Sequence, residues 1–185
     1  MEQEIIEEQS ASSPPFGGRG GCEGGCHFTD NSLLNAANPV TVNLIGAGGT
    51  GSQVLTALAR MNHALTALGH AGLSVRLWDD DIVTAANLGR QLFAACESGL
   101  YKSVALINRA NRFFGTDWKA ETAKFEKDRL GRLPEQARAN IYISCVDSVK
   151  ARFDIADILN SLHTDRFYNS RPRYWLDFGN SQSTG

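Results

Sequence analysis

The sequence predicts an α/β fold with a mostly parallel, doubly wound sheet. Two observations support this prediction. Strand and helix patterns alternate from residue 28 onward, and a glycine-rich turn (GAGGTG, residues 46–51) separates the first strand from the first long helix. Repeated β-α-β order implies parallel strands with helices on both faces. In such sheets, ligands bind at the carboxyl ends of the strands.

The first half of the chain begins this alternation. Residues 40–45 form a short β-branched run, which predicts a strand that ends in the glycine turn. Apolar residues then recur at helical spacing over 54–68, which predicts a helix ending near Gly69. Residues 73–78 alternate as a strand and place Asp79 at its carboxyl end.

The second half repeats the alternation. The expected elements are a helix over 104–114 that stops at Gly115, a weaker strand over 118–125, a buried strand over 139–146, a helix over 155–162 and a last strand over 174–178. Asp79, Asp147 and Asn180 each follow a strand. We therefore expect them to lie near one shared site at the carboxyl edge of the sheet.

The chain divides into a tail and a single domain. Residues 1–27 are acidic, then rich in Ser and Pro, then rich in glycine, so we expect disorder. This tail contains Cys22, Cys26 and His27, which resemble half of a zinc site. No second pair of ligands follows at zinc-finger spacing, which favours a tail without bound metal. Residues 28–185 form the predicted nucleotide-binding domain. Its C-terminal part is expected to be missing, because the chain stops soon after the last strand.

Composition excludes several classes of protein. A net charge of −2 gives no general affinity for nucleic acid or anionic membranes. No apolar run approaches the roughly 20 residues that span a bilayer, and the N-terminus is acidic, so we expect a cytoplasmic protein. The four cysteines do not make a disulfide framework. Cys96 and Cys145 are expected to be small buried residues.

The glycine turn has the spacing of a phosphate-binding loop. Gly46 suits a tight turn, Gly48 a close approach to phosphate, and Gly51 close packing of helix on strand. The helix that follows would present backbone N–H groups and its positive dipole end to a polyphosphate.

Polar residues after the second strand favour a nucleoside triphosphate over a redox cofactor. Asp79 is placed to accept hydrogen bonds from ribose hydroxyls. Arg90 can bind phosphate oxygens as a fork, and Asn87 and Gln91 are one turn apart if the segment is helical. Lys102 opens the next helix, where its charge opposes the dipole, which predicts a nearby anion.

Asp147 is the predicted metal ligand. It ends a buried strand, and Mg²⁺ in proteins prefers one or two carboxylates together with phosphate oxygens. Ser148 would cap the following helix. No role is assigned to the histidines, which are His27, His63, His70 and His163.

The glycine turn, residues 79–91 (DDDIVTAANLGRQ), Lys102 and residues 145–147 (CVD) together resemble the ThiF/MoeB/HesA superfamily of ubiquitin-activating-enzyme-like proteins. Within it, residues 28–31, 69–90 and 111–116 look like the ThiF-family member of the PRTRC gene cassette of bacterial plasmids and mobile elements. The resemblance covers roughly residues 28–185.

The resemblance implies a Rossmann-like fold, ATP and Mg²⁺ as cofactors, and adenylation of the C-terminal glycine of a ubiquitin-like protein. The implied nucleotide-binding residues are Gly46, Gly48, Gly51, Asp79, Asn87, Arg90, Gln91 and Lys102. Of these, Asp79 would hold the ribose, while Arg90 and Lys102 would act with Asp147 in catalysis, with Asp147 as the magnesium ligand. The resemblance is also compatible with a homodimer.

Three departures from the pattern leave other functions open. Relatives often receive an arginine from a partner's N-terminal region, and here only Arg19 lies there. Ser148 stands where many relatives have Asn, and the chain stops before the segment that carries a catalytic cysteine in thiol-transferring members. One alternative is a non-catalytic partner of a ubiquitin-like protein. The other is an NAD(P)-dependent oxidoreductase, which would leave the phosphate-directed residues without a role.

Overall fold

The computed structural model describes residues 28–126, 137–163 and 172–179. The expected tail over residues 1–27, with its cysteine pair and histidine, lies outside these ranges, and so does Asn180.

Five parallel strands form one sheet in the order β3-β2-β1-β4-β5. They are β1 (Val40–Ile45), β2 (Leu73–Trp78), β3 (Lys119–Glu121), β4 (Ile141–Ser144) and β5 (Tyr174–Asp177). The chain builds outward from β1, first through β2 to β3 and then through β4 to β5. This reversal leaves a crevice at the carboxyl ends of β1 and β4, where such sheets bind ligands.

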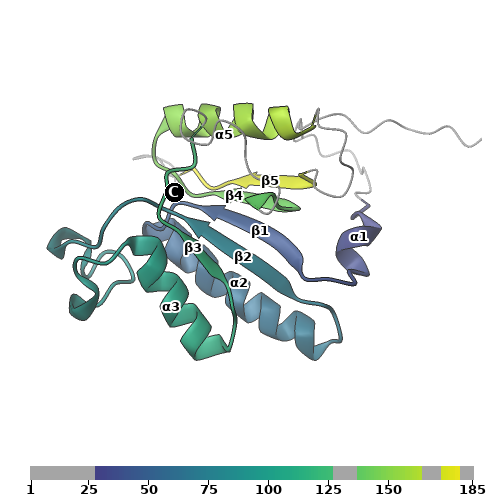
Figure 1. Ribbon diagram of the computed structural model, residues 1–185, viewed down its shortest axis with the longest axis horizontal. Coiled ribbons are helices and arrows are strands. Elements are labelled where there is room, and N and C mark those ends of the chain that lie inside the picture. The colour runs from purple at the N-terminus through teal and green to yellow at the C-terminus, as the bar shows by residue number, and fades with distance from the viewer. Residues whose placement is uncertain (1–27, 127–136, 164–171, 180–185) are drawn as a thin grey trace, which may run out of the picture.

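Helices cover both faces of the sheet, as predicted (Figure 1). The covering helices are α2 (Gly49–Ala67), α3 (Lys102–Phe114) and α5 (Val149–His163), while the short α1 (Asn31–Leu34) buries no residue. Helices α2 and α3 lie on one face and α5 on the other. Gly115 ends α3 in the left-handed conformation, at the predicted stop. No helix within the described ranges is both long and apolar enough to cross a membrane.

Side chains of β1 alternate between two apolar cores, as the pleat of a strand requires. Val42 and Leu44 pack with α2 and α3, while Ile45 packs on the α5 side. The buried Asn43 also faces that second side. It accepts a hydrogen bond from Trp78 Nε1 (3.0 Å) and donates to the carbonyl of Ala137 (2.7 Å), so both ends of its amide are satisfied.

Two strands are shorter than the sequence pattern predicts. β3 covers only Lys119–Glu121 of the expected 118–125, because Phe125 leaves the sheet and packs edge-on against Trp78. β4 ends at Ser144, because the next residues turn away to form the loop before α5.

The expectation that Cys96 is buried was wrong. It lies exposed in the 3₁₀ turn η2 (Ala95–Glu97), within the long loop between β2 and α3. Phe93 is the side chain of this segment that reaches the core, and the residues after it turn outward. Cys145 is partly buried, and burial with the nearby charge of Asp177 raises the pKa of its thiol to about 11. A thiol with this pKa remains protonated near neutral pH.

Candidate functional site

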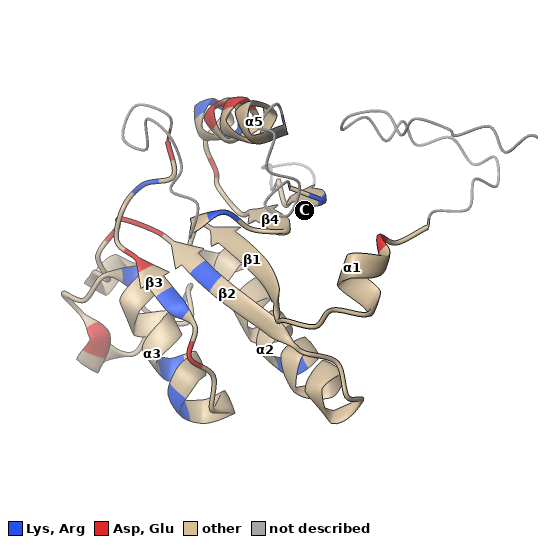
Figure 2. Cartoon of the chain, turned by 45° about the vertical axis from the view of Figure 1, so that its right-hand side comes forward, with Lys and Arg blue, Asp and Glu red and all other residues tan. Residues whose placement is uncertain are grey.

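A pocket of about 720 Å³ opens at the carboxyl edge of the sheet. Its walls come from the turn after β1, the segments after β2, β3 and β4, and the first turns of α3 and α5. In Figure 2, acidic residues (red) mark the segments where β2 and β3 end. The acidic residues 79–81 after β2 line the pocket. The predicted residues that line it are Gly46, Gly48, Asp79, Arg90, Gln91, Lys102 and Asp147.

The glycines of the turn have different structural roles. Gly46 has a positive φ of 97°, and a Cβ there would lie 2.8 Å from the carbonyl oxygen of Cys145. At Gly51 a Cβ would lie 1.9 Å from the carbonyl oxygen of Gly46, so only glycine lets α2 pack on the turn. Both residues are therefore required by backbone packing, as predicted for Gly51.

Gly48 faces open space, where no described atom lies within 4 Å of the position that a Cβ would occupy. It precedes the first turn of α2, and its own residue type offers no side-chain hydrogen bond to that turn. The backbone N–H groups at a helix start, together with the dipole, attract anions. This end of the pocket can therefore hold a phosphate group.

Asp79 connects β2 to the glycine turn. Its Oδ2 accepts a hydrogen bond from the backbone N–H of Ala47 (2.6 Å), and its Oδ1 accepts one from that of Asp81 (2.9 Å). Burial raises the pKa of Asp79, although these hydrogen bonds and Lys102 act in the opposite direction. A carboxylate has about four lone-pair sites, so two backbone bonds leave acceptor capacity for a ligand hydroxyl.

The anion predicted near Lys102 is a residue of the chain itself. Lys102 is buried at the start of α3, and its Nζ lies 2.7 Å from Oδ2 of Asp81. The backbone N–H of Lys102 also donates to the carbonyl of Asp81 (2.9 Å). Because the side chain of Asp81 is mostly exposed, an incoming phosphate can replace it as the partner of the ammonium group.

Arg90 and Gln91 line the pocket, but Asn87 is not among the described residues that do. Asn87 is buried, and its Oδ1 accepts hydrogen bonds from Thr84 N (2.9 Å) and Oγ1 (3.0 Å). It thereby closes the 3₁₀ turn η1 (Ala85–Asn87). The structure thus gives Asn87 a role in the shape of the loop that presents Arg90 and Gln91.

The two pocket-lining residues of this loop retain hydrogen-bonding capacity. Arg90 donates from Nε to the carbonyl of Ala86 (2.8 Å), and a guanidinium carries four further donors. Gln91 Oε1 is buried without a hydrogen-bond partner among the described residues. Leaving a buried polar atom unpaired costs about 1–3 kcal/mol. A polar ligand is therefore favoured here, and rotation of the amide can present its NH₂ group instead.

Asp147 lies exposed on the loop between β4 and α5, and it lines the pocket. Ser148 caps α5 as predicted, since its Oγ accepts from the backbone N–H of Ala151 (3.4 Å). In the described ranges, no three His, Cys, Asp or Glu side chains gather to hold a metal. A cation at Asp147 would thus need further ligands from a bound anion, which is how Mg²⁺ usually binds with nucleotides.

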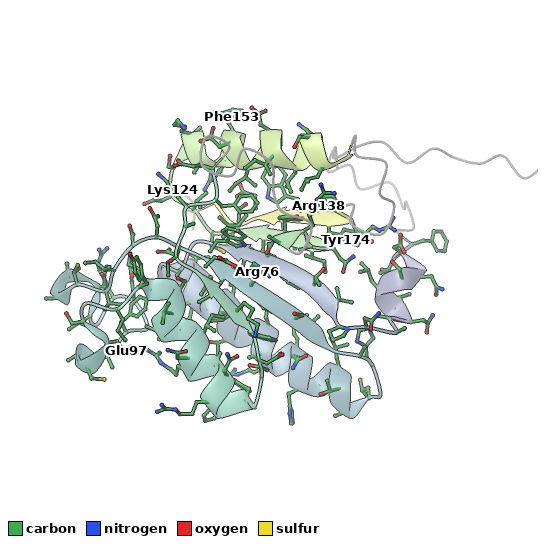
Figure 3. The ribbon with its side chains drawn as sticks, viewed as in Figure 1. Arg76, Glu97, Lys124, Arg138, Phe153 and Tyr174 are labelled. Carbon is green, nitrogen blue, oxygen red and sulfur yellow. The ribbon has the colours of Figure 1, made fainter. Side chains whose placement is uncertain are left out.

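Several pocket residues were missed by the sequence analysis. They are Thr50, Trp78, Asp80, Lys124, Phe125, Glu126, Lys150 and Asp154. Figure 3 places Lys124 between the end of β3 and α5. The rule that ligands lie where parallel strands end would have found residues 124–126, but the strand before them had only a weak pattern. Lys150 and Asp154 form an i,i+4 ion pair (2.6 Å) on α5, a spacing that usually marks only a solvated helix face.

Comparison with known proteins identifies a family. Residues 27–174 match the profile of the ThiF family. The comparison with curated proteins gives no significant match.

Solved structures share the fold. The tRNA N6-threonylcarbamoyladenosine dehydratase TcdA of E. coli has 20% sequence identity and a TM-score of 0.56, over 80% of this chain and 54% of that chain. TcdA complexes with ATP and with AMP match equally well. E. coli MccB with MccA has 22% identity and a TM-score of 0.52, over 80% of this chain and 38% of that chain. The present chain thus spans about half of TcdA and less of MccB.

Proposed function

Because the chain belongs to the ThiF family, we propose that its pocket binds ATP with Mg²⁺ and that the protein adenylates the C-terminal glycine of a ubiquitin-like protein. One observation carries the proposal. Residues from separate strand ends and helix starts converge on one pocket, where cations and a helix N-terminus lie beside a carboxylate. A triphosphate needs the cations and the helix N-terminus, while a ribose needs the carboxylate.

Each part of ATP can be assigned to a different group of residues in the pocket wall. The triphosphate fits the start of α2 with Arg90, Gln91 and Lys102, which supply positive charge and N–H donors. The ribose hydroxyls fit the acceptor sites left on Asp79. The adenine would lie against the apolar wall at the ends of β2 and β3, where the largely buried rings of Trp78 and Phe125 meet edge to face at 5.2 Å. A volume of about 720 Å³ lies within the usual range for small-ligand pockets.

The reaction requires little covalent participation by the protein. An oxygen of the substrate carboxylate attacks the α-phosphorus, the bond from that phosphorus to the bridging oxygen of the β-phosphate breaks, and pyrophosphate leaves. Arg90 and Lys102 would neutralise the negative charge that develops on the phosphates and would orient them for in-line attack. Lys102 exchanges Asp81 for phosphate when the nucleotide enters. Mg²⁺, when bound, adds further neutralising charge, and Asp147 would hold it.

Structural neighbours support a nucleotide in this fold. TcdA has been crystallised with ATP and with AMP, and MccB with MccA. The resemblance of residues 28–31, 69–90 and 111–116 to the PRTRC cassette member supports a ubiquitin-like partner encoded in the same cassette. In this proposal the protein acts in the cytoplasm, and two copies form a homodimer.

Pyrophosphate–ATP exchange tests the proposed activity. We expect labelled pyrophosphate to enter ATP only when the protein is mixed with a ubiquitin-like protein that ends in glycine. The control is the same partner without its terminal glycine, which should support no exchange. Exchange that is equal with both partners would contradict the proposed carboxylate substrate, and no exchange together with no ATP binding would contradict adenylation.

A further inference from the structure

A chain of polar contacts lies behind the loop that carries Asp147. Ser144 is fully buried at the end of β4, and its Oγ donates to Oδ1 of Asp177 (2.5 Å) while accepting from Nε1 of Trp175 (3.0 Å). Nε of Arg152 lies 3.4 Å from Oδ2 of the same carboxylate. These contacts connect β4, β5 and the first turns of α5.

The side chain of Arg152 binds one neighbour of Asp147 in the chain, and its backbone binds the other. Its Nη2 donates to the carbonyl oxygen of Val146 (3.1 Å), and its backbone N–H donates to the carbonyl oxygen of Ser148 (3.3 Å). Arg152 itself is not among the described residues that line the pocket, whereas Val146, Asp147 and Ser148 are. Its contacts therefore act on the pocket through this loop.

The guanidinium group suits this bridging position. It is planar and rigid, so it can hold a carboxylate and a carbonyl at a fixed separation, which the single ammonium of a lysine cannot do. The backbone after β5 packs against it, since a Cβ at Gly179 would lie 2.9 Å from Nη2 of Arg152. The side chain is only about one quarter exposed (27%), so its contacts are partly shielded from water.

We propose that Arg152 is a positioning residue that holds the Val146–Ser148 loop so that Asp147 faces the phosphates of a magnesium-bound nucleotide. Asp177 pairs with the guanidinium, and Ser144 holds that carboxylate through its hydrogen bond. This inference rests on the proposed function, because it concerns the magnesium-linked part of ATP binding. Residues that orient a metal ligand typically change metal affinity by about 10–100-fold when they are substituted.

Calorimetric titration of the full chain with ATP, in excess Mg²⁺ and in EDTA, tests the inference. For Arg152→Gln we expect the affinity for ATP in Mg²⁺ to fall by about tenfold or more, while the affinity in EDTA stays within about twofold of wild type. The affinity of Arg152→Lys for ATP in Mg²⁺ should lie between those of wild type and Arg152→Gln. The lysine keeps the charge but can make only one of the two side-chain contacts. Arg76→Gln is the matched control, since Arg76 is similarly exposed (25%) and also pairs with a carboxylate, Glu121, outside the pocket. It should retain both affinities.

The outcomes separate this inference from the proposed function. If the wild type binds no ATP under either condition, the proposed function fails. If the wild type gains affinity from Mg²⁺ and Arg152→Gln keeps the whole gain, the positioning role is overturned. An equal loss in Mg²⁺ and EDTA also overturns it, since Arg152 would then only maintain the pocket. If Arg152→Gln does not fold, the ATP affinities of Arg152→Lys and Asp177→Asn in Mg²⁺ and in EDTA test the positioning role in the same way.

Discussion

Asp147 is exposed at the pocket wall, and this position separates its role in binding from any role in stability. Asp147→Asn keeps the size and polarity of the side chain but removes the charge that a magnesium ligand needs. We expect adenylation to fall by about 10²-fold or more, which corresponds to about 2.7 kcal/mol of barrier. The melting temperature without ligand should stay unchanged, because an exposed carboxylate has no burial cost to relieve.

Exchange rates and thermal melts of the purified variant measure both effects. At the end of a buried strand, which the sequence pattern predicts for Asp147, removal of an unpaired charge would also stabilise the protein. The loop position excludes that gain. A variant that melts early while its folded fraction keeps full exchange would show that Asp147 is structural.

The raised pKa of Asp79 makes stability depend on pH in a defined direction. Burial, its largest cause, lifts the pKa above the ordinary value of 3.8. Below about pH 3.8 the carboxyl is protonated in both folded and unfolded chains, so it contributes no penalty. As the pH rises from there through the folded-state pKa, the folded chain binds more protons than the unfolded chain, and stability is lost. Above the folded-state pKa the loss is constant.

Urea denaturation of wild type and Asp79→Asn across this pH range measures the effect. The free energy of unfolding of the wild type should fall relative to the variant as pH rises from about 3.8. Subtracting the two curves removes the contributions of other groups. The variant should also lose ATP affinity, because an amide offers one acceptor oxygen where the backbone N–H groups of Ala47 and Asp81 require two. A wild type that gains stability over the variant as pH rises would contradict the assignment.

Single residues also show what the sequence could not predict. The position of Lys102 against the helix dipole predicts a nearby anion, and in the structure Asp81, 21 positions earlier, pairs with its ammonium group. A nucleotide phosphate beside Lys102 stays a prediction. Asn87 has the residue type of a phosphate ligand, yet its amide oxygen binds Thr84 in the same loop. Side chains of this kind bond equally well to backbone or ligand, and the loop conformation decides between them.

At the scale of elements, the junction of the glycine turn with α2 provides a pair of matched variants. Gly51→Ala would place its methyl group 1.9 Å from the carbonyl oxygen of Gly46, so the turn or the helix must move. Such overpacking costs about 3 kcal/mol, against a helix-propensity gain of about 1 kcal/mol at most. Gly48→Ala meets no described atom within 4 Å and has a negative φ of −72°, so the fold should be retained.

Thermal melts and ATP titrations distinguish the two variants. Gly51→Ala should melt several degrees below wild type, whereas Gly48→Ala should melt with wild type but bind ATP more weakly, because its methyl group occupies the space next to the helix start. Equal ATP affinity for Gly48→Ala and wild type would mean that no phosphate approaches this position.

The elements were predicted best where burial determines the pattern. β1 matches the predicted 40–45 because its run is β-branched, apolar and almost wholly buried. β2 matches the predicted 73–78 because its apolar residues alternate with Ser74 and Arg76, as its burial does. The apolar periodicity of α2 begins only at Val54, whereas the helix begins at Gly49, since its first turn is glycine and polar residues. The long loop between β2 and α3 could not be predicted, because hydrogen bonds and ion pairs such as Arg109 with Glu97 determine its path.

At the scale of the whole molecule, the parallel direction of the strands and the edge of the sheet that carries the pocket followed from the β-α-β order. Alternating strands and helices imply a parallel sheet, and a parallel sheet brings every strand's carboxyl end to one edge. Asp79 and Asp147 were therefore placed together correctly, although 68 residues separate them in the chain. The same topology does not determine which ligand binds, because dinucleotides and nucleoside triphosphates both bind at this edge of such sheets.

Thermal shift with ATP and NAD distinguishes these ligands. Arg90, Gln91 and Lys102 supply charge and donors that a triphosphate needs and that a dinucleotide does not require. At 100 times the dissociation constant, a ligand stabilises the folded state by about 2.7 kcal/mol, which raises the melting temperature of a domain of this size by roughly 5–10 °C. We expect this shift with ATP and Mg²⁺, and a much smaller shift with NAD at equal concentration. Lys102→Met should lose most of the ATP shift, because its ammonium group is then absent. Stabilisation by NAD alone would identify a redox cofactor site and exclude adenylation.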